Sequence, residues 1–291
     1  MKIGLGTAQF GMDYGISNGA GKIPITEVRE ILDLAGCENI SVIDTASVYG
    51  NSEEVIGNNL PKNSDFSIVT KTPIFTNKSI AQKDVVTLKD TFLCSLKNLK
   101  QASIYGLLIH APDDLLKKGG NALWDTMYDL KNQGLVKKIG ISVYNGEQID
   151  RILENFLPDL IQLPLNVFDQ RLLHSGHLTK LKKMGVEIHA RSVFLQGALL
   201  SKVGMLPECV KGMRSYLQRY YQFVFKNRWT PIQAALGFVL GIKEVDVAFV
   251  GVDSCSHLQD IINFAKPLDN DLFFPFIIDE DTVLNPSKWK L

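Results

Sequence analysis

Residues 4–9 of the chain read Gly-Leu-Gly-Thr-Ala-Gln, and this turn discriminates between the two parallel folds that the remaining sequence allows. A doubly wound open sheet that binds a dinucleotide carries a Gly-x-Gly-x-x-Gly motif directly after its first strand. The turn supplies the first two glycines, but Gln9 occupies the place of the third. The stretch therefore favours a closed barrel over the open sheet.

Outside this turn, short apolar runs rich in β-branched residues alternate with amphipathic stretches of helical period. The strands are expected at residues 3–6, 41–44, 66–71, 104–109, 137–142, 160–163, 187–191 and 247–251. The helices are expected at residues 27–36, 53–59, 83–99, 121–134, 148–155, 178–184, 232–240 and 255–264. Parallel strands need crossover helices. Eight strand–helix units therefore predict a (β/α)8 TIM barrel, with residues 1–291 as a single domain.

One connection is much longer than the others. Residues 195–230 run between strand seven and its helix, and a further helix is expected within them at 208–225. Long loops in compact domains are often lids or binding elements. The C-terminal tail from residue 267 is rich in aromatic side chains, so we expect it to pack on the barrel.

Composition and charge exclude several classes of protein. The chain has 31 Lys plus Arg and 31 Asp plus Glu, and a neutral chain without a basic run has no electrostatic footprint for nucleic acid or an anionic membrane. Its four cysteines contain no Cys-x-x-Cys pair, which argues against a disulfide framework or a zinc site. No signal-peptide hydrophobic region and no apolar run of transmembrane length is present. We therefore expect a cytoplasmic monomer or small homo-oligomer that binds no metal, nucleic acid or membrane.

Polar side chains stand where the second, third and fourth predicted strands end. Asp44 ends the second strand and Tyr49 follows it, while Lys71 ends the third and His110 follows the fourth. Barrel enzymes carry their chemistry at the carboxyl ends of the strands, so these four are the candidate catalytic residues. Each alone has an ordinary structural explanation, such as a salt bridge, a core histidine or a packed tyrosine. Their occurrence at consecutive strand ends favours a common site.

These residue types suit the reduction of a carbonyl group, which needs a hydride on carbon and a proton on oxygen. A Tyr hydroxyl has an unperturbed pKa of about 10, and a neighbouring ammonium lowers that value. We expect Asp44 to hold Lys71 beside Tyr49 for this purpose. We expect His110 to donate a hydrogen bond to the carbonyl oxygen.

The spacing of these residues resembles that of the aldo-keto reductase family. The matching segments are Asp44-Thr45-Ala46-x-x-Tyr49-Gly50, Val69-Thr70-Lys71-Thr72 and Leu107-Leu108-Ile109-His110. The resemblance implies a catalytic tetrad made of Asp44, Tyr49, Lys71 and His110, with Tyr49 as the proton donor. It also implies an NAD(P)H-dependent oxidoreductase that reduces an aldehyde or ketone to an alcohol.

The same resemblance implies a set of cofactor-binding residues. They are Gly6, Thr7, Ser142, Gln162, Arg191, Ser192, Phe194, Gly197, Gly251, Asp253 and His257. Family habit favours NADPH as the cofactor. NADH is the alternative, because Gly251 and His257 stand where the family places a Lys or Arg pair around the adenosine 2′-phosphate, and Asp253 is anionic.

The end of strand seven departs from the family pattern. The family often stacks a Tyr on the nicotinamide there, and this chain has Arg191 instead. A guanidinium is planar and can stack on a ring, but its fixed charge disfavours the oxidised nicotinamide. Arg191 therefore either stacks on the nicotinamide or turns towards an anionic substrate or the pyrophosphate. The Asn that commonly follows the strand-five Ser is replaced by Val143.

The substrate is expected to contact the loop after strand one and the long loop after strand seven. Asp13, Tyr14, Asn18 and Gln196 are polar, which favours a sugar or another polar carbonyl compound. Two other functions stay open. A cofactor-binding regulatory protein would keep the barrel with little turnover. A different barrel enzyme, such as an isomerase or lyase, would need paired carboxylates or metal ligands at strand ends, where the sequence offers only Asp44.

Overall fold

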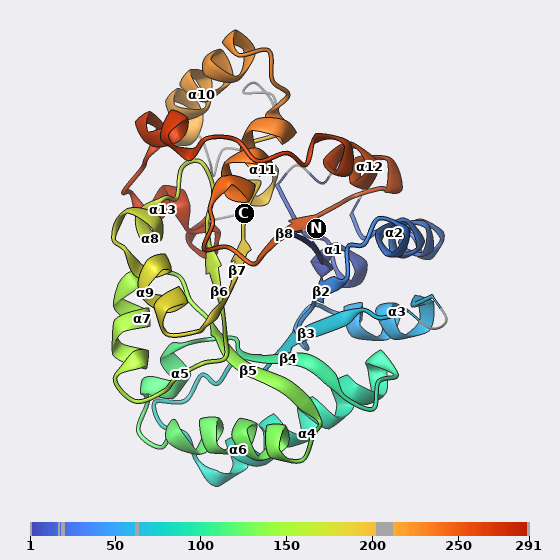
Figure 1. The fold of residues 1–291 in the computed structure, drawn as a ribbon. Helices are drawn as coiled ribbons and strands as arrows, with labels where there is room; N and C mark the ends of the chain where they lie inside the picture. Colours follow the sequence, from blue (N-terminus) through green and yellow to red (C-terminus); the bar gives the residue numbers. More distant parts are fainter. Residues whose placement is uncertain (1, 17, 19–20, 62–63, 202–211, 290–291) are drawn as a thin grey trace.

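The eight predicted strands form a closed parallel barrel in which each strand pairs with its neighbours in the chain and the first pairs with the last. The computed structural model describes residues 2–16, 18, 21–61, 64–201 and 212–289. The strands are β1 (Ile3–Gly6), β2 (Val42–Asp44), β3 (Ser67–Lys71), β4 (Ile104–Ile109), β5 (Val136–Ser142), β6 (Leu160–Pro164), β7 (Glu187–Arg191) and β8 (Val247–Gly251) (Figure 1). The predicted (β/α)8 barrel is confirmed, and no predicted strand boundary is wrong by more than one residue.

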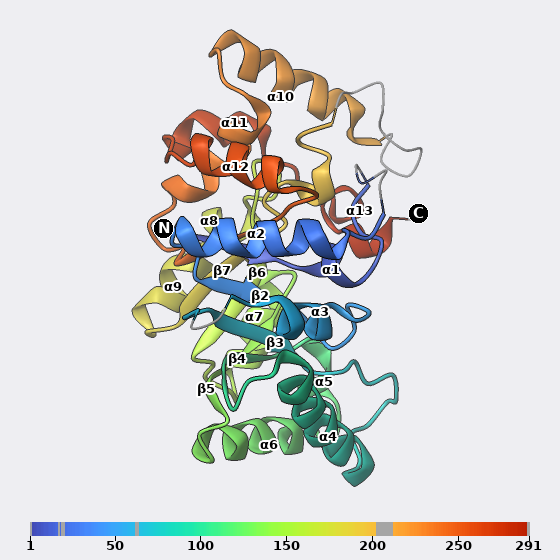
Figure 2. The same cartoon turned by 90° about the vertical axis from the view of Figure 1, so that its right-hand side faces the viewer.

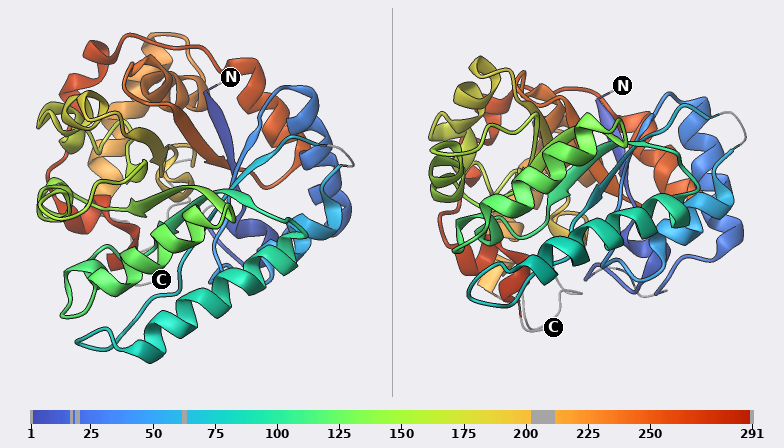
Figure 3. Two further views of the ribbon diagram at one scale, coloured as in Figure 1. Left: turned by 60° about the horizontal axis from the view of Figure 1, so that its bottom comes forward. Right: turned by 90° about the horizontal axis from the view of Figure 1, so that it is seen from below.

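Helices surround the barrel on its outside (Figures 1 and 2). In chain order they are α1 (Ala8–Gly11), α2 (Ile25–Cys37), α3 (Ser52–Asn59), α4 (Gln82–Leu99), α5 (Asp113–Leu116), α6 (Asn121–Asn132), α7 (Gly146–Leu153), α8 (Arg171–His174), α9 (His177–Lys183), α10 (Arg214–Lys226), α11 (Pro231–Gly241), α12 (Cys255–Phe264) and α13 (Asp281–Leu284). Short 3-10 turns are η1 (Leu195–Gly197), η4 (Asn270–Phe276) and η5 (Pro286–Lys288). Figure 3 shows α4 and α6 lying side by side below the barrel.

Three of the helices, α7, α11 and α12, begin with a side-chain cap. Asn145 accepts a hydrogen bond from the amide of Gln148 at 2.9 Å where α7 begins. Thr230 caps α11 in the same way, with Pro231 in the first turn. Ser254 caps α12. Each cap satisfies an amide that has no partner inside its helix, and thereby defines where the loop ends and the helix begins.

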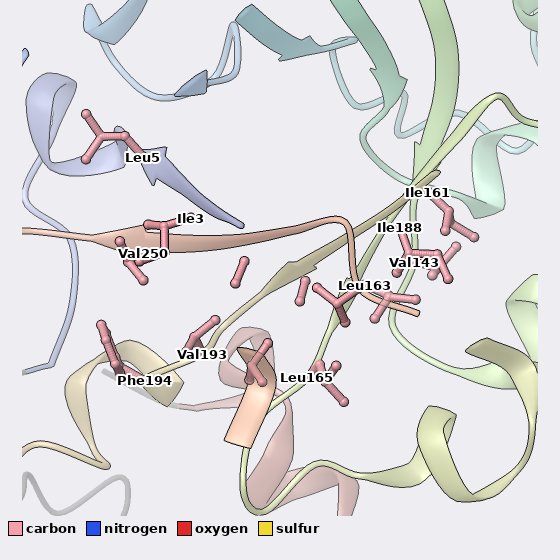
Figure 4. Close-up of a cluster of buried hydrophobic side chains, with 14 of the residues drawn as sticks. Ile3, Leu5, Val143, Ile161, Leu163, Leu165, Ile188, Val193, Phe194 and Val250 are labelled. Carbon is pink, nitrogen blue, oxygen red and sulfur yellow. The ribbon is translucent and has the colours of Figure 1, made fainter. Parts of the chain in front are cut away.

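The main core lies between the strands and the helices. Figure 4 shows part of it, where Ile161 of β6 and Ile188 of β7 lie side by side. A separate small cluster contains Val69, Leu108 and Leu160, which come from β3, β4 and β6. Residues two apart on a strand share a face. On each of these strands, the residue two positions after the cluster residue therefore points to the same face of the barrel, nearer its carboxyl end.

The long connection and the tail behave as their sequences suggest. The connection after β7 contains α10, although residues 202–211 of the predicted loop, and with them the predicted start of its helix, lie outside the described residues. In the tail, Phe273 is fully buried and its ring stacks on Trp229 at 6.0 Å between centroids. Phe274 is exposed, so the tail packs on the barrel with only part of its aromatic residues. Within the described part of the chain, no helix has the length and apolar character needed to cross a membrane.

Candidate active site

The carboxyl ends of the strands surround a cavity of about 360 Å³. All four catalytic candidates, Asp44, Tyr49, Lys71 and His110, line it. All the cofactor-binding candidates line it as well, namely Gly6, Thr7, Ser142, Gln162, Arg191, Ser192, Phe194, Gly197, Gly251, Asp253 and His257. The structure therefore brings the whole predicted set together in one place, while the role of each residue stays a prediction.

The strand period explains why three of these polar groups meet. Lys71, Gln162 and His110 stand two positions beyond Val69, Leu160 and Leu108, the small cluster described above. Lys71 and Gln162 therefore lie above apolar residues on the same faces of their strands, and His110 directly follows β4. The apolar layer closes the barrel beneath the site, and the polar layer forms its floor.

Asp44 and Lys71 form a buried ion pair on this floor. The Lys71 Nζ donates to Asp44 Oδ1 at 2.7 Å and to the carbonyl oxygen of Thr45 at 2.8 Å. Gln162 Nε2 also donates to Asp44 Oδ1, at 2.7 Å. A buried carboxylate needs such partners, because an unpaired buried charge is costly. This contact was not predicted from the sequence, because the resemblance placed Gln162 only among the cofactor-binding residues.

Two glycines hold Tyr49 at the mouth of the cavity. The backbone of Gly50 is left-handed, with φ +57°, which glycine adopts without strain. A Cβ on Gly11 would lie 1.9 Å from the carbonyl oxygen of Tyr49. The turn after β2 therefore packs against α1 only because both positions lack a side chain, and this packing fixes the backbone of Tyr49.

The side chains of Lys71 and His110 both lie next to the ring of Tyr49. The Lys71 Nζ lies 5.0 Å from the centroid of the Tyr49 ring, and the His110 ring meets the Tyr49 ring edge to face at 6.0 Å. Nδ1 of His110 is buried and has no hydrogen-bond partner among the described residues. An unsatisfied buried ring nitrogen in a cavity is a position where a ligand atom fits.

The expected lowering of the Tyr49 pKa by Lys71 is wrong for this geometry. Burial raises the pKa of Tyr49 well above its usual value, and the Asp44 carboxylate raises it further, while the Arg191 guanidinium opposes both. Lys71 is neutralised by Asp44 and lies over the ring, which explains why it does not reverse the shift. Burial also lowers the pKa of His110 to about 3, helped by the positive charges of Lys71 and Arg191.

Arg191 is held by residues that follow strand β5. Its guanidinium lies over the ring of Tyr144 at 4.3 Å, and its Nη2 donates to the carbonyl oxygen of Val143 at 3.0 Å. Its Nη1 donates to Oγ of Ser192 at 3.4 Å. The ring on which Arg191 stacks in this structure is thus a protein side chain.

The loop after β7 is strained where it lines the cavity. Ser192, Leu195 and Gln196 all have positive φ values, of 59°, 48° and 52°, and Gly197 follows with 92°. Such conformations cost about 1–3 kcal/mol each for non-glycine residues and cluster at functional sites. Gln196 Nε2 donates to the hydroxyl of Tyr14 at 3.4 Å, and its buried Oε1 has no partner among the described residues. Strain and an unsatisfied acceptor therefore occur together in the loop that lines this side of the cavity.

The start of α12 carries acidic rather than basic neighbours. The amide of Cys255 donates to the carboxylate of Glu27, which comes from α2. The amide of Asp253 donates to Nδ1 of His257 at 3.4 Å, and burial lowers the pKa of His257. His257 is therefore neutral at pH 7, and the helix N-terminus already has a carboxylate at its first amide.

Several lining residues were not found from the sequence. They include Gln9, Tyr144, Leu200, Phe249 and Pro286, while Tyr14, Asn18 and Gln196 were expected as substrate contacts and do line the cavity. Asp13 does not line it, because its Oδ1 accepts a hydrogen bond from the amide of Lys22 at 2.8 Å. Tyr144 could have been found by extending the strand-end rule two residues beyond Ser142.

The residues present fit a nicotinamide nucleotide better than a metal ion. The described part of the chain contains no group of three or more His, Cys, Asp or Glu side chains that could hold a metal. The unsatisfied His110 Nδ1 and Gln196 Oε1 are suited to hydrogen-bonding with an organic ligand. Ser142, Gln162, the loop after β7 and the start of α12 surround the rest of the cavity. The arrangement is that of a barrel enzyme, with its site at the carboxyl ends of the strands.

Comparison with known proteins identifies the family. Residues 2–273 match the model of the aldo/keto reductase family, so the chain belongs to that family. It is 30% identical over 182 residues to aldo-keto reductase YhdN of Bacillus subtilis (strain 168), a match that covers 60% of this chain and 53% of that protein. It is 27% identical over 171 residues to methylglyoxal reductase DkgA of Escherichia coli (strain K12), with 58% of each chain covered. The chain thus spans between 53% and 58% of the length of these two relatives.

Solved structures share the fold. Aldo-keto reductase AKR11C1 from Bacillus halodurans, in its holo form, matches with a TM-score of 0.76 and 19% identity over 97% of this chain and 95% of that one. The glycerol dehydrogenase AKR11B4 from Gluconobacter oxydans matches with a TM-score of 0.72 and 19% identity, covering 100% of this chain and 93% of that one. The resemblance noted in the sequence is therefore confirmed at the level of family and fold.

Proposed function

We propose that the protein reduces an aldehyde or ketone to an alcohol with NAD(P)H, with Tyr49 as the proton donor. The observation that carries the proposal is the cluster in the cavity in which the buried pair of Asp44 and Lys71 lies beside the rings of Tyr49 and His110. A bound NAD(P)H would supply the hydride, held by Ser142, Gln162, the loop after β7 and the start of α12. Family membership supports this chemistry.

The protein side chains supply orientation and the proton. Because burial raises the pKa of Tyr49, its hydroxyl keeps the proton until the carbonyl oxygen becomes basic during reduction. His110 is neutral because its pKa is about 3, and it donates a hydrogen bond to that oxygen as an uncharged imidazole. Lys71, fixed by Asp44, lies over the ring of Tyr49 and helps to hold that ring in place.

The cofactor form that the charges support is NADH. The family habit that favours NADPH depends on cations around the adenosine 2′-phosphate, and Gly251 and neutral His257 stand at those positions. A dianionic phosphate there would meet Asp253 and Glu27. Like charges at close range disfavour binding, so the site discriminates against the 2′-phosphate.

The test is a Tyr49→Phe variant assayed for NADH and NADPH oxidation with a panel of polar carbonyl compounds that includes methylglyoxal. Loss of a general acid costs about 10²–10⁴ in rate, so the variant should lose most of kcat while it still binds cofactor, as followed by fluorescence titration. Tyr128→Phe is the matched control, because Tyr128 is exposed on α6, outside the cavity. Unchanged turnover in Tyr49→Phe rejects Tyr49 as the acid. Cofactor binding without any turnover in the native protein would instead favour a regulatory role.

A further inference from the structure

The guanidinium of Arg191 is a cation in the cavity without an acidic partner among the described residues. The other fixed cation in the lining, Lys71, is paired with Asp44. Arg191 donates only to two neutral oxygens, the carbonyl of Val143 and the hydroxyl of Ser192. A guanidinium has five N–H donors, so most of its hydrogen-bonding capacity is unused.

The Arg191 side chain is fixed in place before any ligand binds. Its planar group rests on the Tyr144 ring at 4.3 Å, and its two hydrogen bonds hold it at the ends of β5 and β7. A group that is already ordered loses little entropy when a ligand arrives. The free N–H groups therefore form a prepared donor site rather than a mobile surface charge.

The charge of Arg191 reaches the catalytic residues. It lowers the pKa of His110 and works against the raised pKa of Tyr49, although neither residue touches it by hydrogen bond. The groups share one cavity of about 360 Å³. A ligand in this cavity can therefore contact Tyr49 and Arg191 at the same time, because both residues line it.

We propose that Arg191 binds a carboxylate of the substrate, so that the enzyme reduces oxo-carboxylates in preference to neutral carbonyl compounds of the same size. This inference rests on the proposed carbonyl reduction. A half-buried cation without a counter-ion is unfavourable, and a ligand carboxylate removes that cost. The planar fork of N–H donors matches the two oxygens of a carboxylate.

The test compares 4-oxobutanoate with its neutral methyl ester in the native protein, Arg191→Gln, Arg191→Lys and Arg151→Gln. The measured quantity is the ratio of kcat/KM for the acid to that for the ester, because damage common to both substrates cancels in it. A charge-assisted hydrogen bond corresponds to about a tenfold effect or more, so the native ratio should exceed about ten. The ratio should fall to about one in Arg191→Gln. In Arg191→Lys it should lie between one and the native value, because Lys keeps the positive charge but lacks the planar pair of N–H donors.

The remaining outcomes each decide the proposal. Arg151 is an exposed cation on α7, so Arg151→Gln should keep the native ratio. A native ratio near one overturns the proposal. An Arg191→Gln variant that keeps the native ratio but binds NADH more weakly assigns Arg191 to the cofactor and also overturns it. Absence of both NADH and NADPH oxidation with every carbonyl compound is failure of the proposed function instead. In that case, calorimetric titration with 4-hydroxybutanoate and its methyl ester still tests the anion site, and equal binding of the two overturns it.

Discussion

At the scale of single residues, protonation decides what the site does as the pH changes. Tyr49 is surrounded by Asp44, Arg191 and Tyr144, and the net effect of burial and charge raises its pKa. His110 has its pKa lowered to about 3, so it is uncharged above about pH 4. Neither group therefore changes its protonation state between about pH 5 and 9.

The raised pKa of Tyr49 predicts different pH profiles for carbonyl reduction and alcohol oxidation. Reduction needs protonated Tyr49, so its kcat/KM should be flat from about pH 5 to 9. Alcohol oxidation needs the phenolate, whose fraction rises about tenfold per pH unit below the pKa, so oxidation should climb over the same range without a plateau. Initial rates in both directions, with buffers matched in ionic strength, measure this. An ionisation between pH 6 and 7 in the reduction profile would contradict the lowered pKa of His110.

At the scale of elements, a second, half-buried polar cluster links strands at the amino end of the barrel. Glu187 of β7 accepts hydrogen bonds from Tyr105 of β4 at 2.6 Å and from Lys138 of β5, and its other oxygen lies 2.6 Å from Nε2 of His189. Burial alone would raise the pKa of Glu187, but these hydrogen bonds outweigh it and hold the pKa at about 2. Polar residues at the amino end of barrel strands serve stability rather than catalysis.

Glu187→Gln should therefore destabilise the fold in a pH-dependent way. A hydrogen bond to a charged group contributes about 1.5–3 kcal/mol, so we expect a loss of that order in the free energy of unfolding at pH 7. The depressed pKa means that the contribution is present above the unfolded value of about 4.3 and is lost as the pH falls towards 2. Urea unfolding at pH 7 and pH 3.5 measures both parts. Glu147→Gln, at an exposed site on α7, is the control, and an equal loss at both pH values would argue against the ionised cluster.

At the scale of the whole molecule, the site joins many elements of the barrel. Its lining comes from β1, β2, β3, β5, β6, β7 and β8 and from residues that follow the strands, including His110 after β4. A ligand that binds only the folded barrel stabilises all of it, by about 2.7 kcal/mol at a concentration one hundred times its Kd. Cofactor preference can therefore be measured from stability alone, without a substrate.

We expect NADH to raise the melting temperature more than NADPH at equal concentration. The expected rise with saturating NADH is on the order of 5 °C for a chain of this size. His257→Arg should reduce the difference between the melting-temperature shifts with NADH and NADPH. The substitution places a cation where the 2′-phosphate would lie next to Asp253. Scanning calorimetry with both nucleotides measures the shifts. A larger shift with NADPH in the native protein would reject the NADH proposal.

Local features of the chain could be predicted from the sequence, whereas contacts between distant residues could not. The strands and the eight predicted crossover helices agree with the structure to within two residues, because hydrophobic period and capping residues are local properties of the chain. The short helices α1, α5, α8 and α13 were not predicted, and α10 begins later than expected. The convergence of Asp44, Lys71 and His110 could also be predicted, because strand ends meet in a barrel. The cluster around Glu187 was not found, although Glu187, His189 and Arg191 alternate along β7 and share one face.

The sequence by itself determined the barrel, its order of strands and most of the polar residues around its mouth. Only the tertiary structure decided their partners and their charge states. Gln162 meets Asp44, and Arg191 stacks on Tyr144, across gaps of many residues in the chain. Burial raises the pKa of Tyr49, where the sequence suggested a neighbouring ammonium would lower it. The physical reason is that periodicity is encoded locally, whereas desolvation and pairing depend on which groups the fold brings together.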